Sequence, residues 1–346
     1  MKKASYQKYI LNFKQPSGTS RGVLKTKETW FISIIDDTGK VGVGECGMFK
    51  GLSIDDRVDF EDRLQWVCHN INLGFESILS ELIEFPSIQF GLEMAFKSLQ
   101  AKNQFELFPS QFTKGEKAIS INGLIWMGSE DFMRKQIIDK IESGFKCIKM
   151  KIGAINFQKE IEILKSIRKE FSSDDIELRV DANGAFSITD ALEKLKILSD
   201  LNLHSIEQPI KQGQIENMTE LCEKTPLSIA LDEELIGVFS KADKKVLLNT
   251  IKPQYIILKP TLVGGFRGSD DWIEVAEKNN IGWWITSALE SNIGLNAIAQ
   301  YTFKKNNNLP HGLGTGGLFT NNFDSPLEVK NGYLKYNINK KWNFNI

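Results

Sequence analysis

The chain has 346 residues, of which 41% are hydrophobic and 25% charged, so it can bury a large core and need not be disordered. Its 43 Lys and Arg residues balance 44 Asp and Glu residues without a basic run, which argues against a nucleic-acid partner. It has neither an apolar run of the roughly 18 residues that a membrane span needs nor the apolar stretch of a secretion signal. Its four isolated cysteines indicate reduced thiols in a cytoplasmic protein.

The first third of the chain predicts an α+β unit. Residues 1–45 are rich in aromatic and β-branched residues, and the Asp36-Asp37-Thr38-Gly39 segment is typical of a hairpin turn. From residue 55 to about 101 the apolar residues recur every three or four positions, which indicates amphipathic helices. We therefore expect a first domain over residues 1–117, ending in the polar segment 113–117.

From residue 118 on, short apolar runs alternate with amphipathic segments. Eight positions near the ends of these runs follow one another at intervals of 25 to 30 residues: Asn122, Lys151, Asp181, Glu207, Asp232, Lys259, Ser287 and Leu313. That interval accommodates one strand, one helix and two loops, and eight such units predict a (β/α)8-type barrel over residues 118–319. Since barrel enzymes keep their chemistry at the carboxyl ends of the strands, polar residues at these ends are the candidate site.

Three successive predicted strands end in a carboxylate. Asp181, Glu207 and Asp232 each follow an apolar strand, and neighbouring strands of a barrel bring their ends together. Three carboxylates at close range cannot all stay ionised without a compensating charge. The sequence therefore predicts that these residues hold a hard divalent cation such as Mg²⁺.

Lysines flank this acidic triad. Lys149 and Lys151 lie two residues apart on one strand and face the same side, so two inward ammonium groups would lower each other's pKa and make one lysine a base. Lys259 ends a strand half-way around the predicted barrel and would approach a substrate from the opposite side. A metal ion beside a lysine base fits abstraction of a proton α to a carboxylate, and therefore a small-molecule carboxylate as the substrate.

Motifs along the chain resemble the enolase superfamily. The segments are KMK at 149–151, DAN at 181–183, IEQP at 206–209, LDEE at 231–234, LKP at 258–260, SALESNIGL at 287–295 and HGLGTGG at 311–317. In this order they are similar to the muconate-lactonizing subgroup, and within it to the o-succinylbenzoate synthase family. The resemblance implies a modified TIM barrel with an N-terminal α+β capping domain, on which the C-terminal tail, residues 320–346, packs back.

The resemblance also implies residue roles. Asp181, Glu207 and Asp232 would be the Mg²⁺ ligands, with Mn²⁺ as a possible substitute. Lys151 would be the acid/base residue, Lys259 the opposite lysine that stabilises the enolate, and Lys149 the neighbour that lowers the pKa of Lys151. Asn183 and Glu233 would orient ligands or lysines.

The implied reaction is a dehydration in menaquinone biosynthesis. In it, 2-succinyl-6-hydroxy-2,4-cyclohexadiene-1-carboxylate (SHCHC) loses water to give o-succinylbenzoate, with Lys151 first as base and then as acid. Residues 42–53 resemble the lid loop of the capping domain, and Gly42, Gly44, Gly47 and Gly51 would allow its movement. Residues 17–21 suggest a second flap, in which Arg21 is a candidate contact for a substrate carboxylate.

Other functions remain open on the sequence. N-acylamino acid racemases and dipeptide epimerases of the same subgroup use the same groups, although the epimerases usually carry an Asp-x-Asp where this chain has Gly314-Thr315-Gly316. The synthases often have an aspartate at the position of Gly314. Two other classes are a Schiff-base aldolase using Lys259 and a barrel that only binds a ligand. His69, His204, Trp283 and Trp284 are expected to be structural, and His311 to support a loop or strand near the site.

Overall fold

The N-terminal part is a three-stranded antiparallel sheet. The computed structural model describes residues 1–19 and 22–345, and its first strands are β1 (Lys3–Thr19), β2 (Gly22–Ile35) and β3 (Val41–Cys46). Between β2 and β3, Asp36 Oδ1 accepts hydrogen bonds from the backbone N–H groups of Thr38 (2.9 Å) and Lys40 (3.0 Å), which closes the predicted turn. Arg21 lies outside the described residues, but nearby Gly18 forms a β-bridge to Met127 of the barrel.

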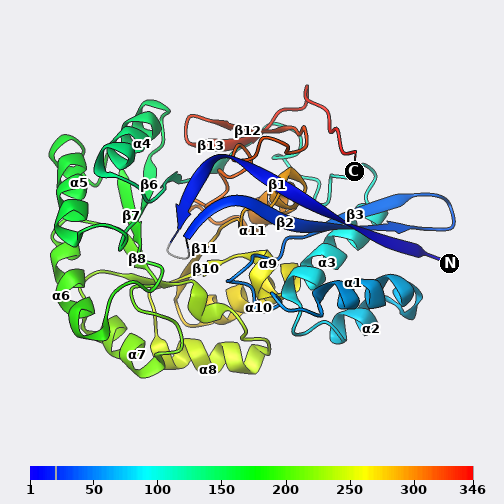
Figure 1. Ribbon diagram of the computed structural model, residues 1–346, viewed down its shortest axis with the longest axis horizontal. Coiled ribbons are helices and arrows are strands. Elements are labelled where there is room, and N and C mark those ends of the chain that lie inside the picture. The colour runs from blue at the N-terminus through cyan, green and yellow to red at the C-terminus, as the bar shows by residue number, and fades with distance from the viewer. Residues whose placement is uncertain (20–21, 346) are drawn as a thin grey trace.

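Helices cover one face of this sheet, as Figure 1 shows. They are α1 (Phe60–His69), the short 3₁₀ helix η1 (Ile71–Leu73), α2 (Phe75–Ser80) and α3 (Pro86–Gln100). A Cβ atom on Gly42 would lie 2.2 Å from Ala95 O, and one on Gly44 would lie 1.8 Å from Gly91 O. The expectation that these two glycines serve lid movement is therefore wrong, because they let β3 pack closely against α3.

Seven parallel strands form the barrel wall, in the spatial order β11-β10-β9-β8-β7-β6-β5. Their bounds are β5 (Gly123–Ile125), β6 (Cys147–Lys151), β7 (Glu177–Asp181), β8 (Ser205–Glu207), β9 (Ile229–Leu231), β10 (Tyr255–Leu258) and β11 (Gly282–Ile285). A short eighth segment closes the ring, since His311 bridges to Ile121 and Gly312 bridges to Thr286 in parallel fashion. The predicted barrel fold class is confirmed.

Helices alternate with these strands along the outside of the barrel. They are α4 (Glu130–Glu142), α5 (Phe157–Glu170), α6 (Ile188–Ser199), α7 (Ile215–Lys224), η2 (Glu233–Leu235), α8 (Lys241–Ile251), α9 (Pro260–Val263), α10 (Gly265–Lys278) and α11 (Asn292–Lys305). Many begin at a capping side chain: Ser129, Ser187, Ser240 and Ser291 each accept a backbone N–H of the first turn. Their apolar faces pack on the strands in a continuous core.

The start of the barrel differs from the prediction. The run predicted as one strand ending at Asn122 is divided into β4 (Ile119–Ser120) and β5, and β5 ends at Ile125. β4 belongs to a separate sheet, where it pairs with the C-terminal hairpin of β12 (Leu327–Lys330) and β13 (Tyr333–Tyr336). The physical reason is that the tail supplies a hydrogen-bonding partner for β4, which the local sequence cannot indicate.

Two buried carboxylates attach the N-terminal unit to the barrel. Glu45 of β3 accepts hydrogen bonds from the backbone of Ser291 (2.9 Å) and Gly294 (2.8 Å) at the start of α11. Glu93 of α3 accepts one from Phe266 N (2.5 Å) at the start of α10. Each carboxyl group therefore lies at the positive end of a barrel helix. The tail adds an aromatic contact, with Phe323 against Phe31 at 5.3 Å between ring centroids.

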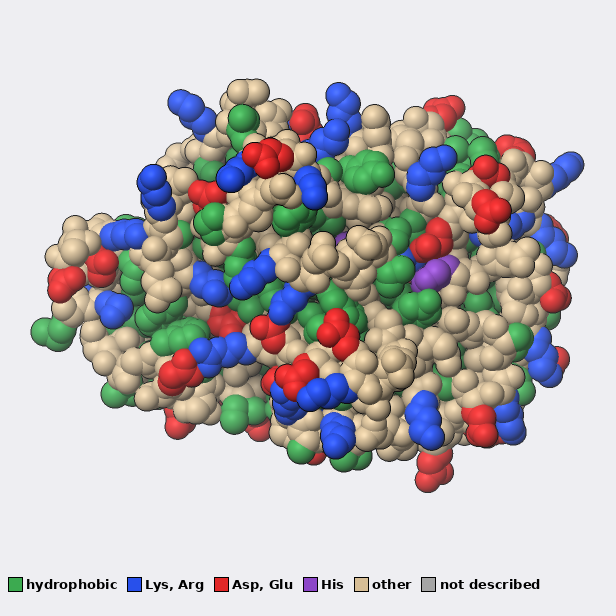
Figure 2. All heavy atoms as spheres, turned by 180° about the vertical axis from the view of Figure 1, so that it is seen from behind, with side chains coloured by type: hydrophobic (Ala, Val, Ile, Leu, Met, Phe, Trp, Pro, Cys, Tyr) green, Lys and Arg blue, Asp and Glu red, His purple; other side chains and the backbone are tan. Residues whose placement is uncertain are grey.

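Charged side chains of both signs are interspersed on the face shown in Figure 2, in keeping with the formal net charge of −1. Within residues 1–19 and 22–345, no helix is both long enough and apolar enough to cross a bilayer.

Candidate active site

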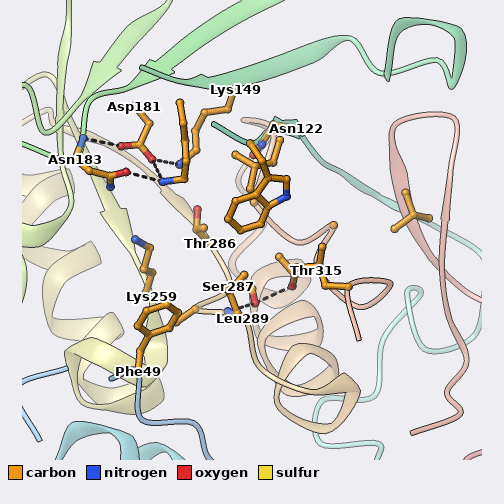
Figure 3. Close-up of a pocket in the computed structure, with 18 of the residues that line it drawn as sticks. Phe49, Asn122, Lys149, Asp181, Asn183, Lys259, Thr286, Ser287, Leu289 and Thr315 are labelled. Atoms are coloured by element: carbon orange, nitrogen blue, oxygen red, sulfur yellow. Dashed lines mark hydrogen bonds and ion pairs between the residues drawn. The ribbon is translucent and has the colours of Figure 1, made fainter. Parts of the chain in front are cut away.

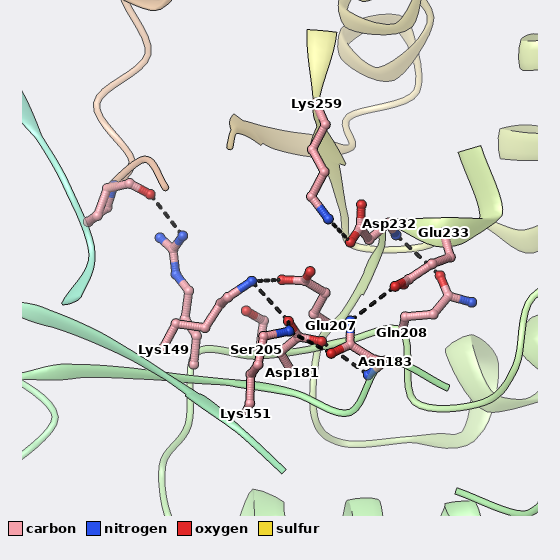
Figure 4. A network of polar contacts seen from close by, with 12 residues as sticks. Lys149, Lys151, Asp181, Asn183, Ser205, Glu207, Gln208, Asp232, Glu233 and Lys259 are labelled. Atoms are coloured by element: carbon pink, nitrogen blue, oxygen red, sulfur yellow. Dashed lines mark hydrogen bonds and ion pairs between the residues drawn. The ribbon is translucent and has the colours of Figure 1, made fainter. Parts of the chain in front are cut away.

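The register of the sheet aligns three predicted side chains in one row. Lys151 of β6 pairs with Asp181 of β7, which in turn pairs with Glu207 of β8. Asp232 directly follows β9, and Lys259 directly follows β10. All five side chains therefore gather at the carboxyl end of the barrel, where Figure 4 shows them in one network.

Each of these carboxylates contacts a lysine. Lys149 Nζ lies 2.6 Å from Glu207 Oε2 and 3.1 Å from Asp181 Oδ2, and Lys151 Nζ lies 3.0 Å from Asp181 Oδ2. Lys259 Nζ pairs with Asp232 Oδ2 and reaches the cluster from the side opposite to Lys149 and Lys151 (Figure 4). The structure thus brings the three predicted carboxylates and the three predicted lysines together.

The pKa values of Asp181 and Glu207 are shifted in opposite directions. For Asp181, burial opposes ionisation, but the ammonium groups of Lys149, Lys151 and Lys259 outweigh it and lower the pKa below its usual value. Burial and the charge of Asp181 raise the pKa of Glu207 well above its usual range. At Glu207, burial and the neighbouring carboxylates therefore outweigh the lysines, and ionisation of this carboxyl group needs further positive charge nearby.

The expectation that two neighbouring ammonium groups lower the lysine pKa is wrong for Lys149. Burial acts to lower its pKa, but the charges of Asp181 and Glu207 outweigh burial and raise the pKa above the ordinary value. The reason is distance, since both carboxylates lie in direct contact with Lys149 Nζ.

The donor set fits a hard divalent cation. Glu207 Oε1 is buried and has no hydrogen-bond partner among the described residues. Three carboxylates on adjacent strands supply the oxygen ligands that Mg²⁺ prefers. Within the described ranges, no three acidic, imidazole or thiol groups are already arranged as a metal-binding cluster, and each of the three carboxylates pairs with an ammonium group instead.

Asn183 links Lys151 to Glu233 through two hydrogen bonds. Asn183 Oδ1 accepts a hydrogen bond from Lys151 Nζ (2.6 Å), and its Nδ2 donates to Glu233 Oε1 (3.0 Å). Asn183 has a φ of 44°, a backbone conformation that asparagine tolerates better than most residues. This arrangement orients the ammonium group of Lys151 toward the cluster.

Gln208 is a supporting residue to which the sequence analysis gave no role. It is fully buried, and its Oε1 accepts hydrogen bonds from the backbone of Asp232 (3.2 Å) and Glu234 (3.3 Å). Its Nε2 donates to Glu234 Oε2 at 3.1 Å. Gln208 therefore fixes the turn that carries Asp232, and its place in the IEQP segment is the signal that could have identified it.

A cavity of about 150 Å³ opens beside these charges, and Figure 3 shows its lining. Lys149, Lys151, Asp181 and Lys259 line one side. The cap contributes side chains from the predicted lid loop, namely Phe49 and Leu52. We call this side, formed by residues of β6 and β7 and by Lys259 after β10, the charged wall; it faces a space that the cap helps to enclose.

The opposite side of the cavity, which we call the neutral wall, follows β11 and the eighth segment. Its residues are all uncharged: Thr286, Ser287, Ala288, Leu289, Gly312, Gly314 and Thr315. Ser287 Oγ donates to buried Glu290 Oε2 (2.6 Å) and accepts from Thr315 Oγ1 (2.9 Å). A Cβ atom on Gly314 would lie 3.5 Å from Ile121 Cδ1, an ordinary contact that leaves room for a side chain.

The histidines and the tryptophan pair have structural positions. His311 is 1% exposed, its Nδ1 accepts the backbone N–H of Ile285 (3.0 Å), and burial lowers its pKa to about 4. It therefore supports the eighth segment as a neutral ring. Trp283 and Trp284 are buried in the barrel as expected, and neither His69 nor His204 lines the cavity.

Comparisons with known proteins agree with this geometry. Residues 133–337 match the family described as enolase C-terminal domain-like. An o-succinylbenzoate synthase from Desulfotalea psychrophila is 45% identical, over 95% of this chain and 98% of that protein. The crystal structure of MenC from the same organism has a TM-score of 0.86 at 42% identity, covering 96% of this chain and 99% of that chain. An L-Ala-D/L-Glu epimerase from Bacillus subtilis is 24% identical, over 93% of this chain and 88% of that protein. The chain belongs to the enolase superfamily and, within it, to the o-succinylbenzoate synthase family.

Proposed function

We propose that the chain dehydrates SHCHC to o-succinylbenzoate as a step of menaquinone biosynthesis. The observation that carries the proposal is the pair of facing lysines, Lys151 and Lys259, on either side of a carboxylate cluster that borders the cavity. The similarity to the Desulfotalea psychrophila synthase extends over nearly the whole chain and supports the same reaction.

Lys151 is the proposed acid and base. Its neutral amine takes the proton α to the substrate carboxylate, and the electron pair of the broken C–H bond forms a ring double bond as the C–O bond to the hydroxyl breaks. The ammonium group then gives its proton to the departing hydroxide, so water leaves and the ring becomes aromatic. Asn183 and Asp181, both within 3.0 Å of Lys151 Nζ, hold the side chain in place for both transfers.

Lys259 and Lys149 have electrostatic roles in this proposal. Burial lowers the pKa of Lys259, but the charges of Asp232 and Glu207 outweigh it and raise the pKa, which keeps the group an ammonium ion. A fixed positive charge on that side stabilises the negative charge that develops on the substrate. Lys149 has 7% of its surface exposed and bridges Asp181 and Glu207, so it positions the two carboxylates.

Asp181, Glu207 and Asp232 are the proposed ligands of Mg²⁺, with Mn²⁺ as a possible substitute. When bound, the ion supplies electrophilic stabilisation of the substrate carboxylate as charge builds up on it. The unpartnered Glu207 Oε1 and the raised pKa of Glu207 support a cation at this place.

The alternatives fit the cavity less well. A dipeptide epimerase needs a carboxylate for the substrate ammonium group, whereas Gly314 has no side chain and lies on the neutral wall. A Schiff-base aldolase needs a neutral nucleophilic lysine, whereas the charges of Asp232 and Glu207 outweigh burial and raise the pKa of Lys259. N-acylamino acid racemisation needs proton transfer from both faces, and the facing lysines keep it as the second candidate.

A substrate comparison tests the proposal. Purified enzyme with Mg²⁺ is assayed with SHCHC, an N-succinylamino acid and L-Ala-L-Glu, and kcat/KM is measured for each. We expect the highest value for SHCHC. A higher kcat/KM for the N-succinylamino acid would contradict the proposal and assign racemisation as the main activity.

We also propose a division into domains and a location. Residues 1–117 and 320–346 form the capping domain, and residues 118–319 form the catalytic barrel, supported by the contact of Phe323 with Phe31. The hairpin of β12 and β13 joins the base of the barrel through β4 and is the exception within the tail. Four free thiols, three of them buried, support a cytoplasmic location, where thiols stay reduced.

A further inference from the structure

A second and larger cavity lies away from the active site. It has a volume of about 450 Å³ and lies between α2 and α3 of the cap and α10 and α11 of the barrel. Figure 1 shows α3 and α10 side by side in this part of the molecule. We call it the interface cavity. Its lining shares no residue with that of the active-site cavity.

Aromatic rings form much of its lining. They are Phe75, Phe96, Phe108, Phe266 and Tyr301. Phe108 and Phe266 meet edge to face with centroids 5.1 Å apart, and Phe75 and Phe96 meet at 4.9 Å. These rings give the cavity apolar lining surface, which can contact the apolar part of a ligand.

Within residues 1–19 and 22–345, two of the cations at this cavity have no carboxylate partner. Arg267 pairs with Glu76 and Lys305 pairs with Asp270, both at 2.5 Å. In contrast, the ammonium groups of Lys97 and Lys304 both lie over the ring of Phe108, at 4.6 and 5.2 Å from its centroid. Among the described residues, neither lysine has a carboxylate within ion-pair distance.

The positive charges of Lys97 and Lys304 repel each other. Burial and the charge of Lys304 lower the pKa of Lys97, and Glu93 and Asp270 offset this effect only in part. Glu93 is committed to the backbone of Phe266 at the start of α10, and Asp270 to Lys305 and Tyr301. An anion between the two ammonium groups would relieve their repulsion, which the protein's own side chains do not.

We propose that the interface cavity is a second ligand site, which binds a small dianion with a flat apolar body, such as an aromatic dicarboxylate. Lys97 and Lys304 hold the two negative charges, and Phe108 and Phe266 contact the ring. Because the walls come from both the cap and the barrel, the bound ligand ties α3 to α10 and α11. This inference is independent of the reaction proposed for the active site.

Calorimetric titration of the Mg²⁺-loaded enzyme with phthalate tests the site. The Lys97→Gln/Lys304→Gln variant removes both charges, and Lys165→Gln/Lys169→Gln on the exposed face of α5 removes the same net charge elsewhere. We expect the first variant to weaken phthalate binding at least tenfold and the second to change it less than twofold. Equal affinity in the wild type and the Lys97→Gln/Lys304→Gln variant would overturn the proposal.

Two further probes and one further variant decide the chemical class. Inorganic phosphate tests charge without a ring, and neutral phthalamide tests a ring without charge. Both should bind at least tenfold more weakly than phthalate, and equal binding of either would overturn the proposed class. Phe108→Leu keeps both lysines and should weaken phthalate binding while SHCHC turnover stays unchanged. Unchanged phthalate affinity in Phe108→Leu would contradict the role of the ring.

Discussion

The two walls of the active-site cavity are built in different ways. The charged wall presents Lys149, Lys151, Asp181 and Lys259 to the cavity, and their ion-pair network also includes Glu207 and Asp232. The neutral wall on β11 and the eighth segment presents uncharged side chains and glycines. Buried charges are costly unless they are paired, so the charged wall can hold its residues only as one network. In the proposed mechanism the charged wall performs the proton transfer, and we expect the neutral wall to determine which substrate fits.

The largest expected effect comes from removing the proposed base on the charged wall. Lys151→Ala should lower kcat for SHCHC dehydration by about 10²–10⁴-fold, the usual contribution of general acid–base catalysis. Steady-state assays at saturating Mg²⁺ measure the change, with Lys165→Ala on the exposed face of α5 as the control. If Lys151→Ala kept the wild-type kcat with an intact circular dichroism spectrum, the proposed role of the charged wall would be wrong.

A second way to break the charged wall is to neutralise a proposed metal ligand. Glu207→Gln keeps the shape of the side chain but removes the charge near the unpartnered oxygen. Loss of a partner in the outer shell of a metal site costs about 10–100-fold in affinity, so loss of a ligand should weaken Mg²⁺ binding at least about 100-fold. Calorimetry with Mg²⁺ measures this change, and Glu142→Gln on the exposed surface of α4 should leave the affinity unaltered.

The neutral wall depends on an uncharged histidine, which makes stability depend on pH. His311 has a pKa of about 4 in the folded state, against an ordinary value of 6.5, so between these values the unfolded chain binds more protons. The free energy of unfolding therefore rises with pH across this window, and it should fall by about 3 kcal/mol on acidification from pH 7 to pH 4 through this group.

Urea unfolding of the wild type and of His311→Gln at pH 7 and pH 4 measures this contribution. The free energy of unfolding falls from pH 7 to pH 4, and this fall should be about 3 kcal/mol smaller in His311→Gln than in the wild type. His69 is exposed on α1, so His69→Gln should show the same change in the free energy of unfolding between the two pH values as the wild type. The same pH dependence in His311→Gln and the wild type would show that His311 is not held neutral by burial.

The smallest expected effect sharpens the role of the neutral wall in substrate fit. In Gly314→Leu the Cβ atom makes only an ordinary contact, but the rest of the side chain fills part of the cavity. We therefore expect KM for SHCHC to rise about tenfold, which corresponds to roughly 1.4 kcal/mol, while kcat changes little. Gly317→Leu is the matched control, because its Cβ would meet nothing within 4 Å and it does not line the cavity. A fall in kcat with unchanged KM would instead connect the neutral wall to the proton transfer.

The charged wall could be predicted from the sequence to a large extent. Asp181, Glu207 and Asp232 each follow an apolar strand, and the topology of a parallel barrel then places neighbouring strand ends together. The pairing of Lys149 with two carboxylates could not be predicted, because it depends on side-chain distances across three strands. The expected pKa of Lys149 was wrong for this reason.

The cap and the start of the barrel were less predictable. Gly42 and Gly44 suggested a mobile loop, but contacts with α3, about 50 residues away in the sequence, decide their role. The split of β4 from β5 follows from pairing with Tyr333 and Leu334, more than 200 residues later. Long-range packing therefore decided the features that local patterns missed.

The proposed role of the three carboxylates is tested by the rate of SHCHC dehydration by EDTA-treated enzyme during titration with Mg²⁺. We predict negligible turnover without the ion and a rise that saturates as the site of Asp181, Glu207 and Asp232 fills. Dehydration at full rate in the metal-free enzyme would contradict a catalytic role for Mg²⁺ at these carboxylates.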